Sequence, residues 1–259
     1  MTRIPRWLGA VVAGVYLFLH VPLLILMAFS FNASRFSVAW NGFTLEWYRD
    51  LLARPDILRG LWLSTVVGLT SAVVSTGLGT LLALALARYR FRGRATVESL
   101  LYVPLVTPEI VVGISLLTLF ASGGMALGVG TIVIAHVAFS VSFVTVVVRA
   151  RLAGMDESLE EAAMILGANQ RTTFFRVTLP QLAPGIMAGA LLAFTLSFDD
   201  YVITSFVAGS GSSTLPVVIY GMVRRTVEPT INAVSTLVLV ATTILIYLAD
   251  RLSRERVAR

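Results

Sequence analysis

The segment Arg149–Ile186, RARLAGMDESLEEAAMILGANQRTTFFRVTLPQLAPGI, separates two long apolar stretches and decides which kind of fold the chain adopts. Its pattern predicts two short helices rather than a flexible linker. Asp156 or Ser158 can cap the first helix, and glutamates follow in its first turn, where the helix dipole favours negative charge. Gly167 is expected to end that helix, since glycine is common just past helix ends. Arg171–Val177 predicts the second short helix, which a leucine–proline pair ends.

One face of the first short helix is apolar and consists of Leu159, Ala162, Ala163 and Leu166. An amphipathic hairpin of this kind needs a surface against which that face can pack. Such a helix can lie on lipid, but anionic head groups would repel its acidic first turn. The pattern therefore favours docking on another protein.

The composition places most of the chain in membrane lipid. Of its 259 residues, 57% are hydrophobic and 13% are charged, and the mean hydropathy is +0.86. A soluble domain has about 25% charged residues. All 20 basic residues are arginine and there is no cysteine, which excludes a phosphate-binding P-loop, a lysine Schiff base, disulfides and thiolate metal sites. The two histidines lie in apolar stretches, so we expect no metal site in this chain.

Six stretches are apolar over the length of about 20 residues that a membrane helix needs. They are roughly Trp7–Phe31, Gly60–Ala87, Val97–Ala121, Gly128–Val148, Gly185–Val207 and Thr230–Ala249. The first is longer than the apolar core of a signal peptide and has no clear cleavage site, so we interpret it as a retained anchor. Small residues in the second stretch indicate close helix packing; they are Gly68, Ser71, Ser75 and Gly79. The predicted fold class is an all-α polytopic membrane protein with six transmembrane helices.

The placement of the arginines predicts the orientation of these helices. If the N-terminus is cytoplasmic, fourteen of the 20 arginines fall on the inside and six on the outside. The positive-inside rule requires this direction. Both termini and the hairpin are then expected in the cytoplasm. The formal net charge of +6 is explained by topology and by contact with lipid, so we expect no nucleic-acid binding.

The hairpin also carries a set of residues at fixed spacing. They are Glu161-Ala162-Ala163, then three residues, Gly167, nine residues, Val177, one residue and Leu179-Pro180. This pattern resembles the EAA loop of binding-protein-dependent ABC importer permeases, with valine at 177 where the family usually has isoleucine. The resemblance implies that the loop, about residues 149–184, is the coupling segment that sits in a groove of a cytoplasmic ATPase. The residues implied in this contact are Glu160, Glu161, Ala162, Ala163, Gly167, Leu179 and Pro180.

The same resemblance implies a single transmembrane permease domain over residues 1–259, with the type I importer fold, in the bacterial inner membrane. It implies three protein partners: a dimer of ATP-binding subunits, a second homologous permease that forms a heterodimer with this chain, and an extracytoplasmic substrate-binding protein. ATP and magnesium would be bound by the ATPase subunits. This chain would then hold no cofactor and would not be an enzyme.

Further segments narrow the resemblance to permeases of spermidine/putrescine importers, and most of all to the second permease of such systems. These segments are Pro104–Leu116, Ser197–Val207, Thr214–Pro216 and Glu228–Ala233. One alternative is the same importer class with another solute, such as another organic cation, ferric iron or sulfate. An ATP-independent channel or secondary transporter is a second alternative, but it leaves the spacing of the EAA pattern unexplained.

Three acids lie inside the predicted spans, where ionisable groups are costly and indicate function. Glu109 follows about 12 residues of the third span, and Asp199 and Asp200 follow about 13 residues of the fifth. Both spans are expected to run from the inside to the outside, so at about 1.5 Å rise per residue all three acids lie about 18–20 Å from the cytoplasmic edge. A ring of carboxylates at one depth would suit a cationic substrate. Pro104 and Pro108 are expected to bend the third span close to this level.

Other roles for these residues remain open. Asp199 and Asp200 can instead cap or break a helix near the outer interface, and Glu109 can pair with an arginine of the partner permease. Tyr201 is either a wall of the substrate pathway or a packing aromatic. His136 enters the fourth span and can approach the acids, but a hydrogen-bonded packing role fits a lone histidine better.

Overall fold

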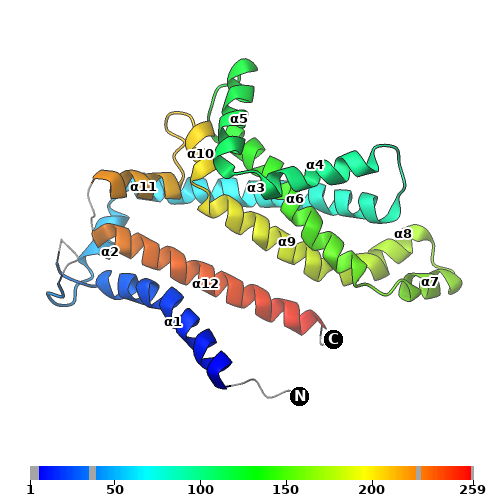
Figure 1. The fold of residues 1–259 in the computed structure, drawn as a ribbon, viewed down its shortest axis with the longest axis horizontal. Helices are drawn as coiled ribbons and strands as arrows, with labels where there is room; N and C mark the ends of the chain where they lie inside the picture. The colour runs from blue at the N-terminus through cyan, green and yellow to red at the C-terminus, as the bar shows by residue number, and fades with distance from the viewer. Residues whose placement is uncertain (1–5, 35–38, 226–228, 258–259) are drawn as a thin grey trace. The chain divides into compact units, whose positions relative to one another are not determined.

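In a computed structural model of the chain, residues 6–34, 39–225 and 229–257 are described, and their regular elements are all helical (Figure 1). The elements are α1 (Arg6–Phe29), α2 (Glu46–Leu52), α3 (Pro55–Arg88), α4 (Arg94–Val106), α5 (Glu109–Ser122), α6 (Val129–Ala153), α7 (Ser158–Ile165), α8 (Gln170–Thr173), the π-helical turn η1 (Phe174–Thr178), α9 (Leu179–Asp199), α10 (Val202–Val207), α11 (Leu215–Arg225) and α12 (Pro229–Val257). The all-α prediction is confirmed. Contacts divide the chain into two compact units, Met1–Leu58 with Ile219–Arg259, and Arg59–Val218.

The first unit contains α1, α2 and α12, and α12 packs against both α1 and α2. The loop between α1 and α2 is organised by Asn32, whose Nδ2 donates to the carbonyl oxygen of Ala39 at 2.7 Å. The Trp47 indole N–H donates to the carbonyl oxygen of Asn32, also at 2.7 Å. The predicted sixth span lies within α12, where the described apolar part, Pro229–Ile244, is shorter than a full span. Residues 226–228, including the glutamate that begins the predicted entry to this span, lie outside the described residues.

In the second unit, α6 lies between α3 and α9. A Cβ atom at Gly79 of α3 would lie 2.7 Å from Val144 Cγ1 of α6, and one at Gly189 of α9 would lie 3.2 Å from the same atom. Ser71 and Ser75 of α3 are also buried. The predicted close packing of the second apolar stretch is therefore confirmed, because any larger side chain at Gly79 would push α6 away.

The third apolar stretch is a broken helix, not a straight span. α4 and α5 are bent by 113° where Thr107 and Pro108 separate them (Figure 1). Pro104 stays inside α4, whereas Thr107 is extended, with ψ 132°, as a residue before proline prefers. The predicted bend is confirmed at Pro108. Glu109 directly follows this bend, at the first position of α5.

The fifth apolar stretch differs from its prediction at both ends: its helix begins before Gly185 and ends at Asp199, before the predicted end at Val207. Its helix begins earlier, because α8, η1 and α9 follow one another without a break from Gln170 to Asp199. The expectation that Leu179–Pro180 ends a short helix is therefore wrong. Pro180 lies in the first turn of α9, and the π-helical turn before it widens the helix, with the Leu179 N–H donating to the Phe174 carbonyl. Such widening accommodates the proline ring, which would otherwise clash with the carbonyl four residues back.

Candidate functional site

The predicted hairpin is present as α7 and α8, and polar side chains fix the start of each helix. Asp156 Oδ1 accepts a hydrogen bond from the Ser158 N–H at 2.9 Å. The Ser158 hydroxyl and this N–H both donate to the carboxylate, which lowers the pKa of Asp156 below its usual value. Asn169 Oδ1 accepts from the Thr172 N–H at 2.9 Å and so caps α8. These caps stabilise the hairpin without a contact to any other helix.

Gly167 forms the turn between the two helices. Its φ of +90° is a left-handed conformation that other residues adopt only with strain. The N–H groups of Gly167 and Ala168 donate to the carbonyl oxygens of Met164 and Ala163, both at 3.0 Å, which closes the end of α7. The prediction that Gly167 ends the first short helix is confirmed.

The apolar face of the hairpin is uncovered in this chain. The side chains of Ile165 and Leu166 are 85% and 88% exposed, and Leu159 is exposed as well. Ala162 and Glu161 also lie on the surface, and the Glu161 carboxylate has no hydrogen-bond or ion-pair partner among the described residues. The hairpin therefore offers both an apolar face and an unpaired carboxylate to a partner.

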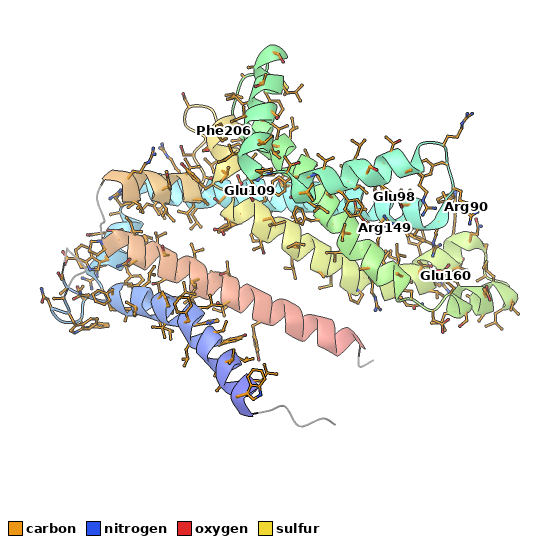
Figure 2. The ribbon with its side chains drawn as sticks, in the orientation of Figure 1. Arg90, Glu98, Glu109, Arg149, Glu160 and Phe206 are labelled. Atoms are coloured by element: carbon orange, nitrogen blue, oxygen red, sulfur yellow. The ribbon has the colours of Figure 1, made fainter. Side chains whose placement is uncertain are left out.

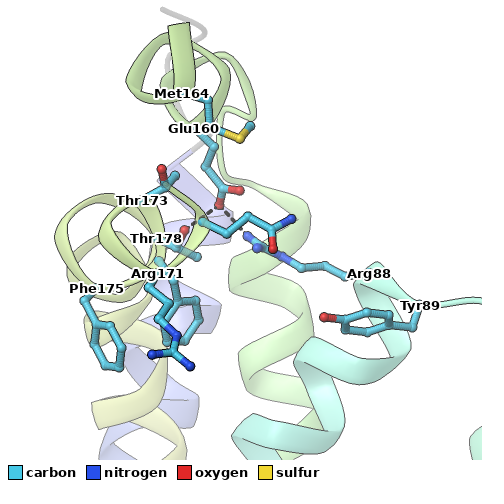
Figure 3. A pocket seen from close by; sticks show the side chains of 10 residues that line it. Arg88, Tyr89, Glu160, Met164, Arg171, Thr173, Phe175 and Thr178 are labelled. Atoms are coloured by element: carbon cyan, nitrogen blue, oxygen red, sulfur yellow. Dashed lines mark hydrogen bonds and ion pairs between the residues drawn. The ribbon is translucent and has the colours of Figure 1, made fainter. Parts of the chain in front are cut away.

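The preceding glutamate, Glu160, points the other way, into the chain. Its Oε1 accepts a hydrogen bond from the Thr178 hydroxyl at 2.7 Å and forms an ion pair with Arg88 at the end of α3 (Figure 3). This pair ties α7 to both α3 and η1. No local sequence pattern predicts this ion pair, because Arg88 lies 72 residues from Glu160.

A cavity of about 440 Å³ lies beside this ion pair. Its lining is polar, basic and aromatic, and includes Arg88, Tyr89, Glu160, Arg171, Phe174 and Phe175 (Figure 3). Ala163 and Leu179 are half-buried, and Pro180 is exposed at the start of α9. The residues of the EAA pattern thus lie on or next to one exposed hairpin, with a polar hollow beside it.

The acid pair lies at the opposite end of the same long helix, where α9 ends and α10 begins. Asp200 is buried, and it accepts hydrogen bonds from the Ile203 and Thr204 N–H groups at 3.3 and 2.7 Å and from the Thr204 hydroxyl at 2.7 Å. Asp200 therefore caps α10, which confirms the capping alternative for this residue. The neighbouring Asp199 is exposed and has no hydrogen-bond or ion-pair partner among the described residues. Tyr201 is half-buried.

His136 of α6 packs against this break. Its side chain is fully buried, with Nδ1 2.6 Å from Ser197 Oγ and Nε2 3.2 Å from Asp200 Oδ2. The prediction of a hydrogen-bonded packing role for His136 is confirmed. The sequence analysis did not identify Ser197 or Thr204 as members of this cluster, since neither residue type signals burial in a membrane helix.

Glu109 lies on another helix, at the first position of α5 (Figure 2). It is exposed and has no hydrogen-bond or ion-pair partner within the described residues. Phe206 of α10 packs on α5, where a Cβ atom at Gly113 would lie 2.6 Å from its ring. The two half-helices that follow the breaks, α5 and α10, are therefore packed together. Within the described residues, no group of three or more His, Asp or Glu side chains could hold a metal ion.

Comparison with known proteins gives one family. Residues 75–259 match the family described as binding-protein-dependent transport system inner membrane component. The chain is 40% identical to the spermidine/putrescine transport system permease protein PotC of Escherichia coli strain K12, over 96% of this chain and 94% of the relative. It is 41% identical to the putrescine transport system permease protein PotI of the same strain, over 93% of this chain and 90% of the relative.

Solved structures agree on the fold. The structure of a bacterial ABC transporter involved in the import of the acidic polysaccharide alginate matches with a TM-score of 0.74, at 15% identity, over 96% of this chain and 94% of that chain. An amino acid ABC transporter matches with a TM-score of 0.63, at 18% identity, over 82% of this chain and all of that chain. At such identities these structures bear on the fold alone. From the family match and the near full-length relatives together, the chain belongs to the binding-protein-dependent transport system inner membrane components, the permeases of ABC importers.

Proposed function

We propose that this chain is a permease subunit of an ATP-driven importer of polyamines, with spermidine or putrescine as substrate. The observation that carries the substrate is the 40% and 41% identity to two polyamine permeases over more than nine tenths of the chain. The exposed, unpaired Asp199 and Glu109 support a cationic substrate, because carboxylates can replace the water lost by ammonium groups. Tyr201, two residues after Asp199, would line the same pathway.

The proposal assigns the exposed hairpin to coupling with the ATPase. The family of this chain is described as an inner membrane component of binding-protein-dependent transport systems, which implies a substrate-binding protein and an ATPase as its partners. The uncovered Ile165 and Leu166 would fill an apolar groove, and Glu161 would meet a basic group of the ATPase. Gly167, Ala162 and Ala163 allow the close approach that such docking needs.

The long helix supplies a mechanical link between docking and transport. It runs over 30 residues from Gln170 to Asp199 and is therefore about 45 Å long at 1.5 Å per residue. Its first turn is α8, the second arm of the hairpin, and its last residue is the exposed Asp199. When ATP binding closes the two ATPase subunits, the hairpin docked on them would be displaced. The helix from Gln170 to Asp199 would move with it and change the surroundings of Asp199.

The remaining partners follow from the same proposal. A second, homologous permease would pair with this chain and complete the substrate pathway. ATP and magnesium would be bound by the ATPase subunits, outside this chain. Both termini would lie in the cytoplasm, on the side of the hairpin, as the arginine distribution predicts.

Uptake of radiolabelled putrescine and spermidine by cells with and without this gene tests the proposal, before and after ATP depletion. We expect ATP-dependent uptake that deletion abolishes and that the gene restores. Unchanged uptake after deletion would refute the polyamine assignment. In that case, other organic cations, ferric iron and sulfate would be measured in the same cells. Uptake that survives ATP depletion would refute the ATP-driven mechanism.

A further inference from the structure

One buried imidazole contacts both sides of the break between α9 and α10. His136 of α6 has its Nδ1 2.6 Å from Ser197 Oγ, one turn before the break, and its Nε2 3.0 Å from Thr204 Oγ1, one turn after it. The same Nε2 lies 3.2 Å from Asp200 Oδ2, at the break itself. The side chains of His136 and Asp200 are 0% and 5% exposed.

Hydrogen-bond accounting fixes which ring nitrogen carries the hydrogen. The Thr204 hydroxyl has one hydrogen and donates it to Asp200 Oδ2 at 2.7 Å. Thr204 Oγ1 and the Asp200 carboxylate can therefore only accept from His136. Nε2 must be the donor, and in the neutral ring Nδ1 then accepts from the Ser197 hydroxyl.

The cap of α10 does not itself need the histidine. Asp200 already accepts from the N–H groups of Ile203 and Thr204 and from the Thr204 hydroxyl, all on its own side of the break. What His136 adds is a bond to each side at once. The backbone of Asp200 is extended, with ψ 123°, so α9 does not continue into α10, and a third element that bonds to both half-helices helps to hold their mutual angle.

The geometry points to His136 as a positioning residue for transport: it holds the α9–α10 break so that Asp199 keeps its exposed orientation. Asp199 is the last residue of α9 and directly precedes Asp200, the residue that caps α10. Its carboxylate has no hydrogen-bond or ion-pair partner in the described chain, so its direction and surroundings depend on how the break is held. This inference rests on the proposed function, since the orientation of Asp199 matters only if a cation passes it.

The test uses the whole transporter, this chain with its partner subunits, reconstituted in proteoliposomes. His136→Leu removes the donor, His136→Gln keeps an N–H donor, and His20→Gln is the matched control, because His20 is exposed and bonds only within α1. We expect His136→Leu to raise the KM for putrescine about two- to fivefold, no more than Asp199→Asn itself does, with kcat within about twofold. His136→Gln should recover most of this loss. Asp199→Asn combined with His136→Leu should be no worse than Asp199→Asn alone, because both act on one interaction.

A merely structural histidine would give the opposite pattern. An unchanged KM, with a maximal uptake rate that falls only in proportion to the amount of assembled complex, would overturn the inference. Additive effects of Asp199→Asn and His136→Leu would overturn it as well.

A distance measurement separates this inference from the polyamine assignment. The chain has no cysteine, so nitroxide labels can be placed at Ala188→Cys on α9 and Ser205→Cys on α10, both exposed positions. His136→Leu should broaden the distance distribution between the labels, whereas His20→Gln should not. If wild-type vesicles accumulate no polyamine but the distribution broadens, the proposed function fails and the role of His136 in holding the break stands. An identical distribution in wild type and His136→Leu would overturn that role.

Discussion

The two ends of the helix from Gln170 to Asp199 are built in opposite ways. At its start, the hairpin is held by local caps, and its apolar residues Ile165 and Leu166 face outward. At its end, Asp200 and His136 are buried in a polar cluster that joins three helices. The only exposed acid there is Asp199, which adjoins the cluster.

The difference shows how each end tolerates change. The hairpin is held by its own caps and by the contacts of Glu160 with Arg88 and Thr178, and it leaves its outer surface for a partner. Substitutions on that surface should therefore affect coupling more than folding. The buried end has each hydrogen-bonding group matched to another, so a substitution there leaves unpaired groups in a low-dielectric interior. Each pair of adjacent acids therefore has two roles. Glu160 and Asp200 hold the structure, whereas Glu161 and Asp199 remain available to a partner or a substrate.

The largest effect is expected at the buried end, for Asp200→Leu. This change leaves the N–H groups of Ile203 and Thr204 and the Thr204 hydroxyl without their acceptor, and leaves the His136 donor with Thr204 Oγ1 alone. We expect a loss of about 3 kcal/mol in the free energy of unfolding, because breaking a buried polar network has this order of cost. The thermal inactivation midpoint of the purified complex should fall by about 5–10 °C. Asp200→Asn keeps one acceptor oxygen, so its thermal inactivation midpoint should fall less. Equal midpoints for wild type and Asp200→Leu would show that the buried network does not stabilise this end.

The next largest effect is expected at the hairpin, where folding should survive and coupling should fail. Gly167→Pro cannot adopt φ +90°, and Glu161→Arg reverses an unpaired surface charge. We expect uptake per ATP hydrolysed to fall about tenfold or more in both variants, measured on the reconstituted complex. Asp50→Arg makes the same charge reversal on α2 and serves as the control. A wild-type ratio in both hairpin variants would contradict the assignment of the docking surface.

A smaller effect is expected for the exposed acids, because a solvent-accessible charge contributes less than a buried one. Asp199→Asn and Glu109→Gln should each raise the KM for putrescine about two- to fivefold, with normal assembly. Raising the ionic strength should weaken the wild-type interaction in the same direction. Transport kinetics that are unchanged in both variants would remove these carboxylates from the substrate pathway.

Local chemistry is what the sequence predicted well. Gly167, Asp156 and Pro108 act through their own backbone or their immediate neighbours, and each was assigned correctly as a turn, a cap and a bend. The errors came from long-range geometry. The widened π-helical turn before Pro180 let the helix continue past the position where it was expected to end. The bond of Glu160 to Arg88 and the contacts of His136 join distant segments, and no periodicity in one segment encodes them.

The smallest predicted effect concerns the cap of the hairpin and its dependence on pH. The Ser158 hydroxyl and N–H stabilise the ionised carboxylate of Asp156, so its pKa is lower in the folded hairpin than in the unfolded chain. A lowered pKa means that the cap contributes fully above the unfolded pKa of about 3.9 and is lost as the pH falls through the folded value. Hydrogen exchange at the first turn of α7 should therefore show a protection factor that decreases from pH 5 towards pH 3, after correction for intrinsic rates. Asp156→Asn should remove most of this dependence while the protection at Gly167 persists, because that turn contains no titrating group. A wild-type profile that is flat over this range would mean that the N–H groups of α7 are satisfied without the carboxylate.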